Sequence, residues 1–495
     1  MELIKRHKEE HVPMKFQFKP QRLSTCRIIE KSLGILFAFN PISPVIRVIE
    51  VQTKVKNHLR SPAPGVFSFA LSLCHLVILS LLMSVPAFAE PVVLIGRDLP
   101  AFIGVPVGNL RIVNARGVAI PFQIDEKTAG GDYIANGGVE SNADSAHPGL
   151  QSQDEIVFLN EDADSSASRA GGFAPGELKR AAPITLTGGS GTKTVYLLND
   201  STVPLSPVRY VSYDEKTEYV KTPWYYAQFG RNRFHFIRAG IGEGLGDRYF
   251  DLTNRLRIEI VLKTLWGILP IRYNEDNIVC TVKRYKVGPV RLIRRGDFYL
   301  RLGLFGLKGS RAVVYQTCYP QAVEVPIHVH LPVRLGSLFR EAYIEMSPVV
   351  NTNARGFAFA IPSLGTSFAC SSPGRIDTFI RTIPDQGFMV SNGLIGFAWV
   401  TRFGVSEDHL QGSGYLFHRP SKQGLAECGL RYVVRDLPKG DYAVANWVLF
   451  PRPCIAPPSG AILDLIKPAT VDVSGKKAVD LFMAPFAGWP PPGRI

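Results

Sequence analysis

The chain has 495 residues, 46% of them hydrophobic, and a formal net charge of +14. Its length predicts two or three domains, and its hydrophobic content excludes a disordered or collagen-like chain. Glycine and proline number 45 and 37, so long helices are not expected to dominate.

Residues 66–89 form an apolar run without a charged residue. The run follows a basic flank and ends in Ala87-Phe88-Ala89, a pattern typical of a secretory signal. We therefore expect an exported protein, periplasmic, surface-exposed or secreted, that begins at Glu90. The alternative is an uncleaved membrane anchor through residues 66–88, because the run is long enough to span a bilayer. Residues 1–65 are either a real N-terminal extension or the product of a start codon assigned too early.

The rest of the chain consists of one strand pattern after another. We predict a β-domain with acidic loops over residues 90–205, a basic β-sandwich over 206–350 and a C-terminal β-region over 351–495. Apolar residues alternate partly at period two in runs such as residues 256–263, and turn residues separate the runs. No amphipathic helix pattern is evident after residue 90. The fold class predicted is all-β, with two or three antiparallel β-sandwich domains.

Five cysteines follow the apolar run: Cys280, Cys318, Cys370, Cys428 and Cys454. Five thiols cannot all pair within one chain, although four of them could form two disulfides in an oxidising compartment. The sequence leaves the pairing open. Because no CxxC spacing occurs, neither a zinc ribbon nor covalently attached haem is indicated.

Three stretches of the first domain resemble a known group of proteins. They are residues 109–113 (NLRIV), 120–126 (IPFQIDE) and 154–159 (DEIVFL). Over about residues 92–160 they resemble the N-terminal β-domain of exported bacterial proteins related to exo-rhamnogalacturonan lyases. The resemblance implies export, β-structure and contact with carbohydrate, but it transfers no catalytic residue to this chain.

The first domain is acidic, with 12 Asp/Glu against 5 Lys/Arg over residues 90–170. Closely spaced carboxylates can supply the oxygen ligands that Ca²⁺ requires. The candidates are Asp154, Glu155, Glu161, Asp162 and Asp164. Their spacing does not match an EF-hand, and the alternative is a solvated loop. No other cofactor is implied.

Residues 255–311 have the opposite character, with 13 Lys/Arg against 4 Asp/Glu. Arg255, Arg257 and Lys263 share one face if their strand is regular. Such a face, together with Arg294 and Arg295, attracts anionic polymers. Export argues against nucleic acid and favours an acidic polysaccharide, lipopolysaccharide or anionic lipid. The alternative is a sheet face that the acidic first domain neutralises.

An aromatic and basic run occupies residues 224–236. Exposed rings of Trp224, Tyr225 and Tyr226 are suited to the apolar face of a sugar, whereas the same run also suits a core strand. The compact set of His235 with Arg231, Arg233 and Arg238 supplies a base and cations, as a lyase acting on uronic acids requires.

His328 and His330 point to the same side of a strand and form a second metal candidate, against the alternative of an exposed strand edge. The leading functional hypothesis is an exported, non-catalytic β-sandwich protein that binds carbohydrate or an acidic envelope polymer. One alternative is a polysaccharide lyase or a related carbohydrate-active enzyme. Another is a structural envelope protein with protein partners only.

Overall fold

The computed structural model divides the chain into two compact units, of which Val85–Ile495 contains every residue described below. The described residues are 90–143, 146–165, 181–188, 191–231, 233–242, 249–264, 270–302, 307–331, 333–362, 366–370, 376–380, 385–403, 414–419, 426–452, 454, 470–473 and 476–478. The predictions for residues 1–65 and 66–89 lie outside them. No helix within these ranges is both long and apolar enough to span a membrane.

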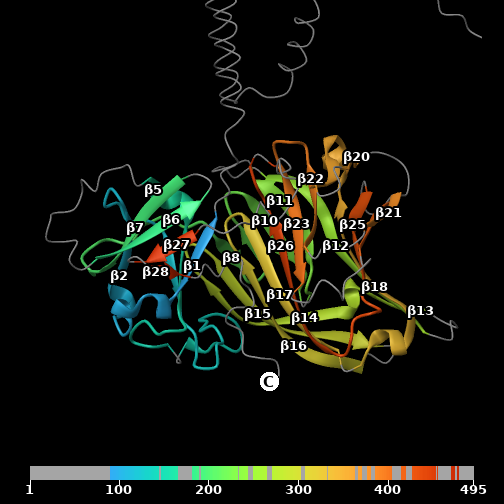
Figure 1. The fold of residues 1–495 in the computed structure, drawn as a ribbon, viewed down its shortest axis with the longest axis horizontal. Helices are drawn as coiled ribbons and strands as arrows, with labels where there is room; N and C mark the ends of the chain where they lie inside the picture. The colour runs from blue at the N-terminus through green and yellow to red at the C-terminus, as the bar shows by residue number, and fades with distance from the viewer. Residues whose placement is uncertain are drawn as a thin grey trace, which may run out of the picture. The chain divides into compact units, whose positions relative to one another are not determined.

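The prediction of an all-β fold is confirmed: the described chain forms antiparallel sheets and its helical segments are short 3-10 turns (Figure 1). These turns are η1 (Gly96–Asp98), η2 (Pro100–Phe102), η3 (Val107–Asn109), η5 (Asn160–Asp162), η7 (Glu275–Asn277), η8 (Leu335–Ser337) and η9 (Thr352–Gly356). Four sheets make up two sandwich-like parts of the fold.

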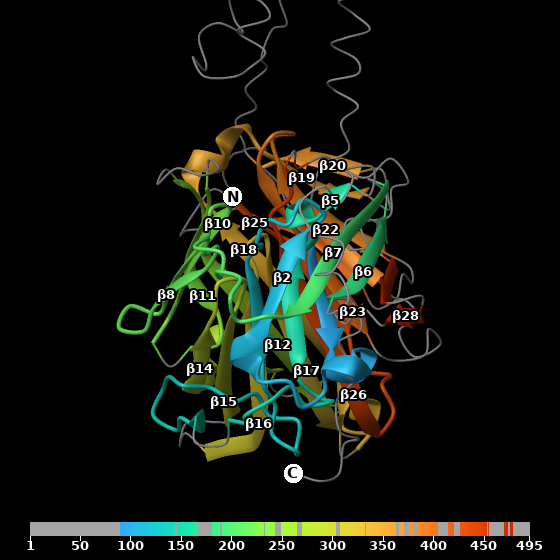
Figure 2. The same cartoon turned by 90° about the vertical axis from the view of Figure 1, so that its left-hand side faces the viewer.

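The first sandwich packs a three-stranded sheet against a six-stranded one, which faces the viewer in Figure 2. The three-stranded sheet has the order β1 (Pro91–Ile95), β4 (Glu155–Leu159), β3 (Phe122–Asp125). The six-stranded sheet has the order β2 (Leu110–Asn114), β7 (Gly191–Asn199), β6 (Ala181–Gly188), β27 (Thr470–Val473), β28 (Lys476–Ala478), and β5 (Asp164–Ser165) pairs with β7. Strands from the C-terminal region therefore complete a sheet that begins near residue 110.

The second sandwich contains a ten-stranded and a nine-stranded sheet. The ten-stranded sheet has the order β21 (Ile376–Ile380), β24 (Gly414–Arg419), β25 (Ala426–Val433), β18 (Phe339–Val350), β12 (Tyr249–Thr264), β11 (Phe236–Gly242), β10 (Tyr225–Phe229), β9 (Tyr219–Lys221), β8 (Ser212–Asp214), and β13 (Pro270–Asn274) pairs with β12. The nine-stranded sheet has the order β14 (Ile278–Val287), β15 (Leu292–Leu302), β16 (Leu307–Cys318), β17 (Ala322–Leu331), β26 (Gly440–Leu449), β23 (Gly396–Phe403), β22 (Asp385–Ser391), β19 (Ala358–Ile361), β20 (Thr366–Ala369). Both sheets draw strands from 206–350 and from 351–495, so these two predicted regions are interleaved.

The three-stranded sheet is covered on both faces. Leu94 and Phe158 pack with the six-stranded sheet, whereas Val93 and Val157 join Trp447 in a cluster with the nine-stranded sheet. Every residue of β1 and β4 is buried. This double burial explains why both strands are nearly continuous apolar runs rather than alternating ones.

The cysteines that the structure describes do not form disulfides. Cys280, Cys318, Cys370 and Cys454 are buried thiols. Burial raises the pKa of Cys280 and of Cys318 to about 11, so both remain thiols at neutral pH.

Candidate functional site

The acidic loop of the first sandwich docks on the basic edge strand β14. Lys283 Nζ lies 2.7 Å from Glu140 Oε1. The backbone N–H of Gly137 donates to Tyr285 O at 3.1 Å, and that of Tyr285 donates back to Gly137 O at 3.0 Å. A Cβ on Gly137 would lie 2.3 Å from the Tyr285 ring, so the close approach requires glycine. Part of the predicted basic segment is therefore neutralised within the molecule.

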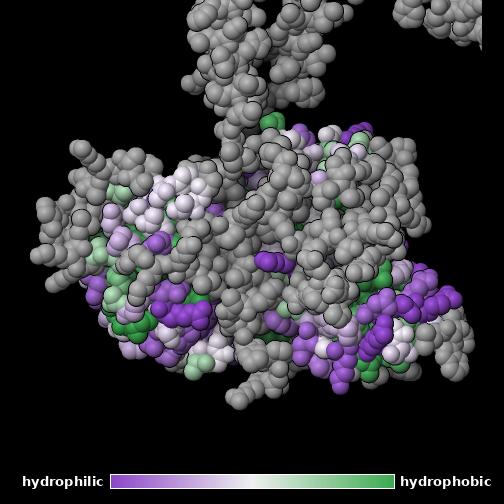
Figure 3. Space-filling model, in the orientation of Figure 1, coloured by the Kyte–Doolittle hydropathy of each residue, from purple (hydrophilic) through white to green (hydrophobic). Residues whose placement is uncertain are grey.

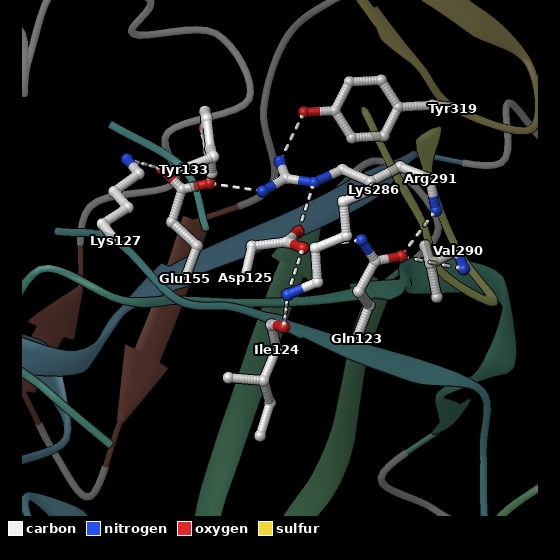
Figure 4. Close-up of polar contacts among 10 residues, drawn as sticks. All are labelled: Gln123, Ile124, Asp125, Lys127, Tyr133, Glu155, Lys286, Val290, Arg291 and Tyr319. Atoms are coloured by element: carbon white, nitrogen blue, oxygen red, sulfur yellow. Dashed lines mark hydrogen bonds and ion pairs between the residues drawn. The ribbon is translucent and has the colours of Figure 1, made fainter. Parts of the chain in front are cut away.

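Arg291 is the centre of a buried network between the two sandwiches (Figure 4). Its guanidinium donates to Asp125 Oδ2 at 2.7 Å, to Glu155 Oε2 at 2.5 Å and to the Tyr319 hydroxyl at 3.0 Å. Burial alone would raise the pKa of Glu155, but Lys127 and Arg291 outweigh it and lower that pKa to about 2. Glu155 is thus an ionised anchor that joins the sandwiches.

The other calcium candidates make separate contacts and do not form one group of ligands. Asp154 accepts from the N–H groups of Gln151 and Lys127 at 2.7 and 2.8 Å and closes a turn. Asp162 accepts from a tyrosine hydroxyl, Asp164 pairs with an arginine, and Glu161 is exposed. Within the described ranges, no three His, Cys, Asp or Glu side chains are grouped to hold a metal ion.

The two histidines of the second metal candidate make different contacts. His330 Nδ1 lies 2.6 Å from Asp441 Oδ1 on the neighbouring strand β26. His328 is partly buried two residues earlier on β17, and burial lowers its pKa.

Several residues predicted to bind ligand contribute to packing instead. Tyr225 is fully buried and stacks on Phe450, with ring centroids 4.3 Å apart. Trp224 is partly buried against the cluster that contains Trp447. Tyr226 is 3% exposed. These rings are rigid framework rather than an open sugar platform, because burial dominates the energetics of aromatic side chains.

Arg294 and Arg295 do not form an open basic surface. Arg294 is 1% exposed, lies 4.0 Å from the ring centroid of Phe229 and pairs with Glu218. Arg295 is partly buried, 4.0 Å from Asp297. Glu218 has φ of 53°, an uncommon value for a residue with a side chain, in the turn that brings its carboxylate to Arg294.

The three basic residues expected to share a face of β12 do so, but each forms an ion pair with an acidic side chain. By the register with β18, Arg255, Arg257 and Lys263 share the outer face of the ten-stranded sheet. Arg255 Nε lies 2.7 Å from Glu275 Oε1, and Arg257 Nη1 lies 2.8 Å from Glu427 Oε1. Lys263 Nζ lies 2.6 Å from Glu341 Oε2. Hydrophilic residues gather at the end of the molecule where β13 lies (Figure 3). Within the ten-stranded sheet, the pairs Arg272–Glu259 and Lys263–Glu341 mix both charges.

The candidate site is a shallow depression of about 430 Å³ on this outer face. It is lined by Gly230, Arg231, Arg233, His235, Ile237, Asn254, Arg255 and Asp276. Ile237 and Asn254 are extra residues at register shifts of β11 and β12, where β-bulges redirect side chains. The structure thus brings together three of the four residues predicted for a lyase site.

The arginines of the depression differ in their pairing. Arg233 lies 2.8 Å from Asp276, and Arg255 lies 2.8 Å from the same carboxylate. Arg231 is exposed and makes no ion pair with any described residue. Arg231 therefore places at the depression a positive charge that no described residue pairs.

His235 forms the buried wall of the depression. It is 2% exposed, and its Nδ1 has no hydrogen-bond partner among the residues described. Burial, followed by the charge of Arg255, lowers the pKa of His235 to about 4. The ring is neutral at neutral pH and retains one unsatisfied polar atom beside the cations.

Arg238 lies outside the depression, although it follows Ile237 directly. It pairs with Asp251 on β12 and lies over the Tyr226 ring, 5.8 Å from its centroid. Arg255 and Asp276 were not predicted as members of the site, because β12 and η7 reach it only through tertiary packing. No local signal in the sequence connects them to His235.

No protein-family model matches the chain. No curated protein matches it either. Among solved structures it is similar to an alpha-mannosidase from Enterococcus faecalis V583 (7% identity, TM-score 0.40, covering 78% of this chain and 45% of that one). It is also similar to a glycosyl hydrolase family 38 protein from Enterococcus faecalis (8% identity, TM-score 0.40, 78% and 46% covered). The Slr1438 protein from Synechocystis sp. PCC 6803 matches at 11% identity and TM-score 0.28, with 50% and 97% covered.

The chain spans less than half of the first two structures. The comparisons show a distant structural similarity of the β-structure and assign no activity to this chain. The finer resemblance to the lyase-related N-terminal domain stays a prediction.

Proposed function

We propose that the protein is an exported envelope protein that binds an acidic polysaccharide, with one carboxylate held in the depression around His235. The observation that supports this is the exposed Arg231, which no described residue pairs, beside the buried His235, whose Nδ1 has no partner in the same part of the chain. A carboxylate placed there would pair with Arg231 beside the neutral ring of His235.

Binding fits the depression better than catalysis does. A general base works best when its pKa lies near the working pH, and a histidine with a pKa of about 4 is a weak base at pH 7. We therefore place the lyase second, as the alternative that product analysis tests.

Export is the second part of the proposal, and it rests on the sequence pattern of residues 66–89. An exported protein meets envelope and extracellular polysaccharides rather than nucleic acid. N-terminal sequencing of the protein recovered outside the cytoplasm should give Glu90. A full-length chain retained in the membrane would instead indicate an anchor.

The binding test uses the full-length protein with hyaluronan, which carries one carboxylate in each disaccharide, and with neutral dextran. Arg231→Ala should weaken hyaluronan binding several-fold at low salt, since an exposed charge contributes up to about 1 kcal/mol. Arg340→Ala is the matched control, because Arg340 is also exposed (62%) but belongs to β18. Binding should weaken with salt, which screens exposed charges over about 8 Å at physiological strength.

Equal binding of hyaluronan and dextran, or equal effects of the two arginine substitutions, would overturn the carboxylate site. Formation of an unsaturated uronate product that disappears in His235→Gln would establish the lyase instead.

A further inference from the structure

A cluster of three tyrosines occupies the outer face of the ten-stranded sheet beside the depression. We call Tyr219, Tyr226 and Tyr249 the tyrosine shelf. The rings of Tyr219 and Tyr226 stack with centroids 5.4 Å apart and planes 21° apart. Tyr249 meets Tyr226 edge-on at 5.4 Å. Tyr226 is nearly buried under its neighbours, whereas Tyr219 retains part of its surface in solvent.

The sheet beneath the shelf and the hydrogen bonds of two tyrosine hydroxyls fix the rings in position. A Cβ on Gly240 would lie 2.4 Å from the Tyr226 ring, so only glycine leaves room for the ring on the sheet. The Tyr226 hydroxyl donates to Asp251, and the Tyr249 hydroxyl donates to Thr222 O at 2.6 Å. An aromatic surface fixed in this way loses little conformational entropy when a ligand stacks on it.

The shelf is continuous with the depression. Arg238 covers the Tyr226 ring, and the preceding residue, Ile237, lines the depression. Tyr219 on β9 lies two strands from Arg238 on β11, roughly 10 Å at the usual strand spacing. A single sugar ring cannot cover both places, but a short oligosaccharide can.

We propose that the tyrosine shelf is a second subsite, on which a neighbouring sugar ring of the same acidic polysaccharide stacks against Tyr219. This inference rests on the proposed function, because the depression holds the carboxylate. It assigns the ligand as a chain of several sugar units rather than a monosaccharide. The apolar CH face of a sugar covers the Tyr219 ring. Arg238, over the Tyr226 ring, and Lys221, over the Tyr249 ring, supply cations for hydroxyl or carboxylate oxygens.

The test measures dissociation constants of the full-length protein by calorimetry, for glucuronate alone and for hyaluronan tetra- and hexasaccharides. Tyr219→Leu keeps an apolar side chain on β9 but removes the ring. We expect it to weaken hexasaccharide binding roughly 2- to 12-fold, the range of an aromatic stacking contact, and to leave glucuronate binding unchanged.

Tyr343→Leu is the matched control. Tyr343 lies on the outer face of β18, partly buried, with the Arg431 guanidinium 4.7 Å from its ring centroid. It has the same chemistry as the shelf but lies away from the depression, so this substitution should not change the affinity for any probe.

The outcomes separate the two proposals. If Arg231→Ala weakens all probes and Tyr219→Leu weakens none, the shelf is structural and only this inference is overturned. If Tyr219→Leu weakens glucuronate and hexasaccharide equally, the second subsite is also overturned. If wild-type protein binds no probe, the proposed function is overturned and the inference with it.

Discussion

Glu155→Gln tests whether the Arg291 network contributes to folding by electrostatics. The pKa of Glu155 is lowered from 4.5 to about 2, because Lys127 and Arg291 outweigh the effect of burial. The folded-state pKa lies below the unfolded one, so the stabilisation is present above pH 4.5 and is lost as pH falls towards 2. A shift of this size corresponds to roughly 3 kcal/mol at neutral pH.

The assay is urea unfolding of wild-type and Glu155→Gln protein at pH 7, 4 and 3. We expect the variant to be roughly 3 kcal/mol less stable at pH 7 and the difference to shrink as pH falls. Glu140→Gln is the matched control, because Glu140 makes a similar ion pair with Lys283 but is exposed. Two results would refute the reasoning. In one, Glu155→Gln loses as much stability at pH 3 as at pH 7. In the other, it loses no more stability than Glu140→Gln does.

A double-mutant cycle with Arg291→Met isolates the pair. Removing one partner of a buried ion pair costs about 3–5 kcal/mol, because the other charge stays buried and uncompensated. Removing both should cost less than the sum of the single changes. Asp125 remains charged next to residue 291, so we expect Arg291→Met to be the more damaging single substitution.

Burial raises the pKa of Glu324 to about 8, above its value in the unfolded chain. The free energy of unfolding of the wild-type protein should therefore decline as pH rises from 4.5 to 8. Urea unfolding of Glu324→Gln at pH 5 and 8 should show no such decline. Burial lowers the pKa of His235, so wild-type stability should fall from pH 6.5 towards 4, and His235→Gln should lack this component. Gly240→Ala should destabilise the protein by about 1–3 kcal/mol through its clash with Tyr226, whereas Gly356→Ala, with open space around it, should not.

The sequence predicts the fold class well because period and turn chemistry are local. Residues 256–263 alternate as expected and lie within β12, and the apolar run before residue 160 is β4. The sequence does not predict the pairing of β6 with β27, because nearly three hundred residues separate the two strands. A strand pattern states which residues face a core, but not which strand is its neighbour.

The candidate site, too, could be predicted only in part from the sequence. Arg231, Arg233 and His235 lie within one turn, so their proximity was predictable from the sequence. The burial of Arg294 was not, because it depends on Glu218, in the turn before β9, and on Gln316 of β16. A charged residue in a strand usually faces solvent, and only tertiary contacts show where it is paired inside.

The pairing of the basic segment changes where an anionic ligand is expected to bind. Lys283 and Arg291 are neutralised by the first sandwich, while Arg255 and Arg257 meet acids brought by η7 and β25. A chain of +14 therefore does not present the +9 of residues 255–311 as one open surface. Arg231, which makes no ion pair with a described residue, lines the depression and lies outside that segment. Affinity for an acidic polymer should accordingly depend on a few contacts near His235 rather than on the summed charge, and its salt dependence should be correspondingly shallow.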